Sequence, residues 1–325
     1  MVDVDAFKTE IAPPRKIHPK VEEMKTTGKL FLSNKLALVG FMITSFYFII
    51  AILDTVYPQY LGVTNDNTYL SWVPGGTPTT IQPSQLLTPS LTPAGGWMFM
   101  LGTTFYNMPI FPAMLAALKF DLGYSLAIVM IGGGIGVVIG VISGYMGGII
   151  DEVMMRVTDI FFSVPFLVLA IAFLFVFGHV LSSVVYALII IWWPIYARLT
   201  RGQALSTKAM NYVESARAAG SSKLRNIFVH VLPNVLSPVY VQFSLDLGSI
   251  VLIFSTLDFL GIVNGNPNIP ELGSLIVAQG NGLSWLIAGY WWPAIIPGIF
   301  LLIFTISINL MGDGLRDVLD PKLRR

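Results

Sequence analysis

Long apolar runs alternate with shorter polar stretches along the chain, a pattern typical of a helical membrane protein. Each run is near the ~20 residues that cross the hydrocarbon of a bilayer. We expect six transmembrane helices, at Leu36–Tyr57, Tyr124–Tyr145, Ile160–Phe177, Leu181–Ala197, Pro238–Phe259 and Trp291–Met311. The third and fourth are short and could form one tight hairpin. A further run, Pro109–Phe120, is too short to cross and is expected to lie at the membrane interface.

Positive charge predicts how these helices are oriented. Among the 19 lysines and arginines, all but Lys119 fall on one side of a six-helix topology. Because cytoplasmic loops carry the excess of Lys and Arg, both termini are expected in the cytoplasm of a multi-pass plasma-membrane protein.

The same pattern divides the chain into five parts. We expect a cytoplasmic N-terminal arm at 1–35, a first transmembrane helix at 36–57 and an extracellular loop or cap, with the interfacial segment, at 58–122. A core of five transmembrane helices follows at 123–312, and residues 313–325 form a cytoplasmic tail.

Composition agrees with a membrane protein and excludes several kinds of chemistry. Hydrophobic residues make up 54% of the chain and charged residues only 11%, against roughly 25% charged in soluble domains. A net charge of +1 gives no field that would attract nucleic acid. The apolar composition predicts that membrane lipid surrounds the chain. Absent cysteine excludes disulfides and thiol nucleophiles, and the three histidines are too dispersed for a metal site.

The polar loop between the fourth and fifth helices, Ser206–Asn234, carries the most specific pattern. Gly220 stands where a helix would end on a left-handed residue, and Ser221 or Ser222 can cap the next helix. Pro233 is expected to end the second helix. The predicted apolar face of the first helix is Ala209, Tyr212, Val213 and Ala216, and that of the second is Leu224, Ile227, Phe228, Val231 and Leu232.

This loop resembles the coupling loop of the membrane subunits of ABC importers. Glu214, Ala216, Gly220 and Leu232-Pro233 match the family pattern, Ser215 replaces an alanine, and His230 stands at an isoleucine position. The His-x-Leu-Pro-Asn order resembles the oligopeptide, dipeptide and nickel branch. The alternative is another kind of helix-turn-helix, such as a DNA-binding unit, but its place between two membrane helices disfavours that.

Further stretches extend the resemblance over about residues 123–325. Met155-Arg156, Asp159 and Pro165 match a second family signature, which the resemblance implies lies near the coupling surface. Glu152 and Arg156 alone could also be a plain surface ion pair at i and i+4. The C-terminal run Gly312–Pro321 and Phe259–Gly261 match as well, whereas the stretch after Leu101–Thr103 lacks the charged residues usual there.

The resemblance implies an all-α, type I ABC importer permease fold and a transport function. Such a subunit forms half of a translocation pathway with a second permease. Two ATPase subunits hold ATP and Mg²⁺, and an extracellular binding protein delivers the solute. No cofactor is expected in this chain, which has no phosphate-binding G-x-x-x-x-G-K-[ST] motif and is not expected to be an enzyme. The branch moves di- and oligopeptides, nickel chelates or oligosaccharides, and the sequence does not choose among them.

A secondary transporter or channel without an ATPase is the first alternative, and a membrane enzyme the second. Ion-coupled transporters carry ionisable residues inside their spans. Only Asp54, Asp246 and Asp258 lie near or within a span here, and no acid, base or metal constellation for an enzyme is visible.

Two patterns inside the spans predict close packing and a polar face. Gly132, Gly136, Gly140 and Gly144 recur every four residues, which favours close helix packing within this subunit or against a second one. Asp246 lies about 12 Å along the fifth span from Pro238, with Gln242 one turn away. Because a carboxylate facing lipid there is costly, Asp246 and Gln242 are expected to line the pathway or to brace the partner permease.

Overall fold

The computed structural model describes residues 28, 31–56, 88–90, 99–104, 108–260, 271–277 and 286–319. The predictions for most of the N-terminal arm, for much of the loops at 58–118 and 263–290, and for the last six residues lie outside the described residues. Within them, helices are joined by turns and irregular stretches, and one isolated antiparallel bridge pairs Thr103 with Pro109.

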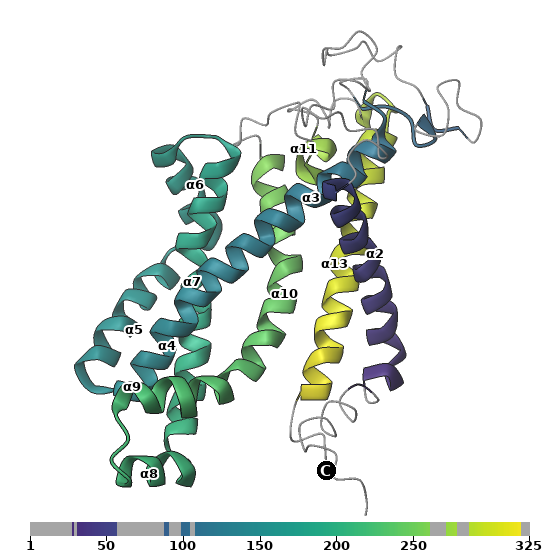
Figure 1. The fold of residues 1–325 in the computed structure, drawn as a ribbon. Helices are drawn as coiled ribbons and strands as arrows, with labels where there is room; N and C mark the ends of the chain where they lie inside the picture. The colour runs from purple at the N-terminus through teal and green to yellow at the C-terminus, as the bar shows by residue number, and fades with distance from the viewer. Residues whose placement is uncertain are drawn as a thin grey trace, which may run out of the picture.

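Figure 1 shows the helices, which run along one another with α8 and α9 at the opposite end of the bundle from α11. In chain order they are α2 (Lys35–Val56), α3 (Ile110–Ile128), the π-helical turn η6 (Val129–Gly133), α4 (Gly134–Met146), α5 (Gly148–Ser163), α6 (Phe166–Phe177), α7 (Leu181–Lys208), α8 (Asn211–Ala218), α9 (Lys223–Arg225), the π-helical turn η7 (Asn226–Val231), α10 (Leu232–Phe259), α11 (Leu272–Val277) and α13 (Trp292–Leu319).

Within the described residues, five helices are long and apolar enough to cross a membrane, and α5 with α6 would make a sixth if the pair is one span. The first predicted span coincides with α2. The fourth, fifth and sixth are longer than predicted, because α7 continues to Lys208, the fifth begins at Lys223, and α13 continues to Leu319. The predicted tail at 313–325 therefore starts as the last turns of a helix.

The predicted interfacial segment Pro109–Phe120 is not a separate element. Ile110–Met146 is one continuous helix that is long and apolar enough to cross a membrane, and this run forms its first third. Its apolar side chains, such as Ile110 and Leu118, are fully buried against α2, α11 and α13. The charges that interrupt the apolar pattern have partners inside the protein: Lys119 pairs with Asp54 of α2 at 3.2 Å, and Asp121 accepts from the Leu272 amide at 3.1 Å.

The third predicted span, Ile160–Phe177, is not a straight helix. The chain breaks at Val164–Pro165, and α5 and α6 meet at a bend of 91°. Because Pro165 lacks an N–H and disfavours a helical residue before it, Val164 is extended with φ −104° and ψ 132°. The bend turns the second signature away from the axis of α6.

The glycine stripe packs α4 directly onto α7. A Cβ on Gly136 or Gly140 would overlap the carbonyl oxygens of Trp193 and Ala197, and one on Gly144 would lie 2.7 Å from the Arg201 carbonyl oxygen. Backbone therefore meets backbone along this seam, which small residues permit. Of the two interpretations of the stripe, close packing within the subunit is the one that the structure shows.

Two hydrophobic cores result. One gathers α4, α6, α7, α10 and the loop before α10, with Leu174, Leu188 and Tyr196 among its fully buried side chains. The other gathers α2, α3, α11 and α13, and there the Tyr47 hydroxyl donates to the Phe300 carbonyl at 3.0 Å. The long α3–η6–α4 helix passes from the second core into the first.

Candidate functional site

The turn between α8 and α9 has the predicted left-handed glycine. Gly220 has φ +79°, and its N–H donates to the Arg217 carbonyl at 3.0 Å while the Ser221 N–H donates to the Ala216 carbonyl at 3.1 Å. These two bonds form a Schellman motif, which satisfies carbonyls that the end of α8 would leave unpaired. The predicted helix end at Gly220 is confirmed.

The next helix starts at a serine cap but continues past its predicted end. Ser222, one of the two predicted caps, accepts from the Arg225 amide at 3.3 Å. Pro233 does not end the helix, because α9, η7 and α10 form one continuous helix. The wider π-helical turn η7 ends at Val231, two residues before Pro233, and accommodates a residue that has no N–H to donate.

We name Asn211–Val231 the coupling segment. Its predicted apolar faces are divided between core and surface. Val213, Ile227 and Val231 are buried and hold the segment on the bundle, whereas Tyr212, Leu224 and Phe228 are exposed. Ala209 is exposed as well, because it follows the end of α7 and does not belong to α8. The segment therefore presents apolar side chains outward, which the sequence had placed with the buried ones.

The remaining predicted coupling residues lie on or near this outer surface. Glu214, Ser215, Gly220 and Pro233 are exposed, while Ala216, His230 and Leu232 are partly buried. The Asn234 side chain donates to the His230 carbonyl at 2.7 Å. The structure thus brings the predicted residues into one segment at one end of the bundle. Leu232 and Pro233 are the exceptions, because they are the first two residues of α10.

The second signature lies on α5, beside α7. Arg198 of α7 pairs with Asp159 at 2.8 Å, and both side chains are about half exposed. Arg156 pairs with Glu152 at 3.9 Å in a far more exposed arrangement. The latter geometry is that of the plain surface pair considered from the sequence.

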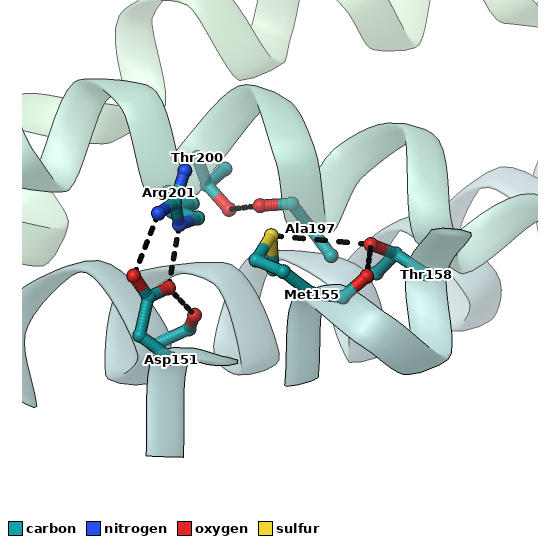
Figure 2. Close-up of polar contacts among 7 residues, drawn as sticks. Asp151, Met155, Thr158, Ala197, Thr200 and Arg201 are labelled. Atoms are coloured by element: carbon teal, nitrogen blue, oxygen red, sulfur yellow. Dashed lines mark hydrogen bonds and ion pairs between the residues drawn. The ribbon is translucent and has the colours of Figure 1, made fainter. Parts of the chain in front are cut away.

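Sequence reasoning missed the strongest polar contact here, between Asp151 and Arg201. Figure 2 shows Arg201 of α7 above Asp151 of α5, with Thr158 and Thr200 on the same two helices. Arg201 Nε and Nη2 donate to the two carboxylate oxygens at 2.5 and 2.6 Å, and the Ser143 hydroxyl donates to Asp151 at 2.5 Å. The contact joins α4, α5 and α7.

Comparison with known proteins decides the family. Residues 136–325, from α4 to the C-terminus, match the family described as binding-protein-dependent transport system inner membrane component. The chain belongs to this family.

Relatives of this permease share most of its length. It is 36% identical over 239 residues to the probable D,D-dipeptide transport system permease protein DdpC of Escherichia coli, covering 74% of this chain and 76% of that protein. It is 29% identical over 307 residues to the dipeptide transport system permease protein DppC of Bacillus subtilis, covering 94% and 88%. The glutathione transport system permease protein GsiD of Pectobacterium atrosepticum is 35% identical over 224 residues, covering 69% and 73%.

The family confirms the expected fold class and function class. The protein is an all-α, multi-pass membrane protein with the type I ABC importer permease fold, and it is a transporter subunit, not an enzyme. The matched residues include the coupling segment and the second signature, while α2 and α3 lie before them.

The predicted pathway residues of the permease, Asp246 and Gln242, lie within a buried hydrogen-bonded cluster. Asp246 is 5% exposed and accepts from Trp192 Nε1 at 2.8 Å, from the Tyr196 hydroxyl at 2.6 Å and from Gln242 Nε2 at 2.8 Å. Trp192 is thus a buried partner of Asp246. These bonds join α10 to α7 within one subunit, and a role for Asp246 in the pathway stays a prediction.

Among the described residues, no group of three His, Cys, Asp or Glu side chains could hold a metal ion.

Proposed function

We propose that this permease forms half of a peptide-translocation pathway, together with a second, similar permease. Two ATPase subunits, which carry ATP and Mg²⁺, dock on the cytoplasmic face of the permease pair, with the coupling segment as this chain's docking surface, and an extracellular binding protein delivers the solute. Support for peptides comes from the relatives, whose names describe dipeptide, D,D-dipeptide and glutathione transport. Nickel chelates and oligosaccharides are the competing solutes.

The division of the coupling segment into an anchored and an exposed face carries the proposal. Val213, Ile227 and Val231 fix the segment to the bundle, so a force applied to it reaches the membrane helices. Tyr212, Leu224 and Phe228 are exposed. Figure 1 shows α8 and α9 at one end of the bundle, where an ATPase cleft would enclose these side chains. A rigid, two-state element pushed by ATP-driven closure would change the packing of the spans.

Co-purification with ATPase subunits tests the docking. The permease is expressed with its partner permease and ATPase subunits, and the complex is isolated through a tag on an ATPase subunit. Glu214→Lys places the opposite charge on the exposed face of α8 and is expected to weaken co-purification. Asp313→Lys, an exposed reversal on α13, is the matched control and should not. Equal recovery of all three complexes would contradict docking on the coupling segment.

Uptake into proteoliposomes tests the solute. Vesicles that contain the complex and enclose ATP should accumulate labelled dialanine when the binding protein is added outside. Accumulation of a nickel chelate or a maltooligosaccharide, without dialanine, would reject the peptide assignment while leaving the docking result intact.

The proposal also places both termini and the coupling segment in the cytoplasm. The absence of native cysteine allows single-site labelling. Ser215→Cys should react with a membrane-impermeant maleimide in inside-out vesicles but not in intact cells. Labelling in intact cells would reverse the orientation.

A further inference from the structure

We propose that Tyr145 and Asn226 form the polar link through which the coupling segment moves the α4–α7 seam. They are positioning residues for transport, and their role rests on the proposed docking of ATPase subunits. Neither residue belongs to the coupling-loop pattern that the sequence matched.

The link lies inside the protein. Asn226 is the first residue of η7 and is fully buried, and its Nδ2 donates to the Tyr145 hydroxyl at 3.0 Å. Nδ2 also lies 3.4 Å from the Ser221 carbonyl, inside the same segment. Tyr145 is 5% exposed near the end of α4. One amide therefore joins the turn after α8 to a transmembrane helix.

Packing alone does not explain an asparagine at this position. In the described residues, Asn226 Oδ1 is buried and has no hydrogen-bond partner. A buried polar atom left unpaired is costly, and an apolar residue of similar size would avoid that cost. An asparagine is favoured where its directional bond is needed, or where a second arrangement of the segment gives Oδ1 a partner.

The other buried side chains that hold the coupling segment on the first hydrophobic core are apolar. Val213, Ile227 and Val231 join the first hydrophobic core, and such contacts are not directional. They resist separation of the segment from the bundle more than they resist sliding along it. The hydrogen bond to Tyr145 fixes the position of η7 along α4.

Tyr145 connects directly to the seam. Its neighbour Gly144 packs on the backbone of Arg201, where an added Cβ would lie 2.7 Å from the carbonyl oxygen. Lys208, the last residue of α7, lies over the Tyr145 ring at 5.6 Å. Ser143 bonds to Asp151 of α5. A displacement of Tyr145 is therefore shared by α4, α5 and α7.

The test measures how much solute moves for each ATP hydrolysed. Complexes whose dialanine uptake has been established are reconstituted with Tyr145→Phe, Asn226→Leu or both. Tyr145→Phe removes one oxygen atom and preserves the ring. Tyr186→Phe, which removes the hydroxyl of an exposed tyrosine on α7, is the matched control. Thermal unfolding and co-purification of the ATPase subunits are measured on the same samples.

We expect Tyr145→Phe and Asn226→Leu each to lower the ratio of uptake to ATP hydrolysis by about three- to tenfold. This loss is within the range measured for mutations that weaken coupling between distant sites. Because both variants break one bond, the double variant should resemble the single ones. ATPase co-purification should be unchanged, as should the ratio in Tyr186→Phe. An unchanged ratio in Tyr145→Phe, or additive losses in the double variant, would overturn the link. Failure of ATPase subunits to bind the unaltered permease would instead reject the proposed function.

Discussion

Arg201 holds Asp151 by both carboxylate oxygens, so that α7 fixes the first turn of α5. Two glycines with positive φ, Gly147 at +67° and Gly148 at +60°, let the chain turn sharply from α4 into α5. Side chains 50 residues apart in sequence are thereby aligned in a two-bond geometry that arginine, with its planar fork, is suited to make.

Replacing Arg201 with lysine should be more harmful than the same exchange at Arg198. Lysine keeps the charge but cannot make the parallel pair of bonds, so Arg201→Lys should lower the free energy of unfolding by ~1–2 kcal/mol. Arg198→Lys affects a half-exposed pair and should cost at most about 0.5 kcal/mol. Chemical unfolding of the two purified variants in the same detergent measures the difference, and equal losses would contradict the special role of Arg201.

Gly140→Ala should destabilise the permease strongly. The added methyl group would overlap the Ala197 carbonyl and the Thr200 hydroxyl, so α4 and α7 must separate, at a cost of about 1–3 kcal/mol. Gly134→Ala, in the same helix, meets nothing within 4 Å and should be neutral or stabilising by up to about 1 kcal/mol. Thermal unfolding compares them, and a benign Gly140→Ala would show that the seam is looser than described.

Gly220→Val should disturb the coupling segment without unfolding the bundle. An added Cβ meets no neighbour, but a β-branched residue at φ +79° is strained by roughly 1–2 kcal/mol. Co-purification of ATPase subunits should fall. Gly220→Asn is the control, since asparagine tolerates the left-handed conformation and should retain most of the association. Similar recovery with Val and Asn would mean that the turn is not needed for docking.

Asp246→Asn should preserve the fold. The asparagine oxygen can accept from both Trp192 and Tyr196, and its amide can donate to a reoriented Gln242. Asp246→Leu leaves all three donors without an acceptor and should cost at least about 3 kcal/mol. Thermal unfolding of the two variants measures this contrast, and equal destabilisation would show that the charge itself is needed.

The same residue tests the pathway hypothesis. If Asp246 lines the route, Asp246→Asn should change uptake or solute preference, because it removes the charge while keeping the hydrogen bonds. Asp246→Cys should also react with a water-soluble thiol reagent in some state of the ATP cycle. Normal uptake by Asp246→Asn, together with no labelling in any state, would leave only the bracing of α10 on α7.

What could be predicted from the sequence was governed by local rules. Gly220, the Ser222 cap and the close packing of the glycine stripe follow from conformational preferences or residue size, and the structure shows them. The start of this helix could not be predicted so, because the apolar run Pro109–Phe120 alone is too short to cross a membrane and Lys119 and Asp121 separate it from the next apolar run. Their partners, Asp54 and the Leu272 amide, are distant in sequence.

The candidate site shows the same limit. A periodic apolar face predicts that side chains share one side of a helix, but not whether that side meets the core. Ile227 is buried and Phe228 is exposed although both were placed on one face, because the core covers only part of that face. The bonds of Asp151 to Arg201 and of Asn226 to Tyr145 join segments that only the fold brings together.

The π-helical turn η6 divides the longest helix into two rods. The outer rod, α3, packs in one hydrophobic core, and the inner rod, α4, packs in the other. At the junction, Gly133 has no side chain and lies against the rings of Tyr196 and Phe243. A pivot at this point could tilt the inner rod, together with α7, while the contacts of the outer rod stay intact. Such a joint would let α4 change direction relative to α3 while each helix keeps its packing in its own core.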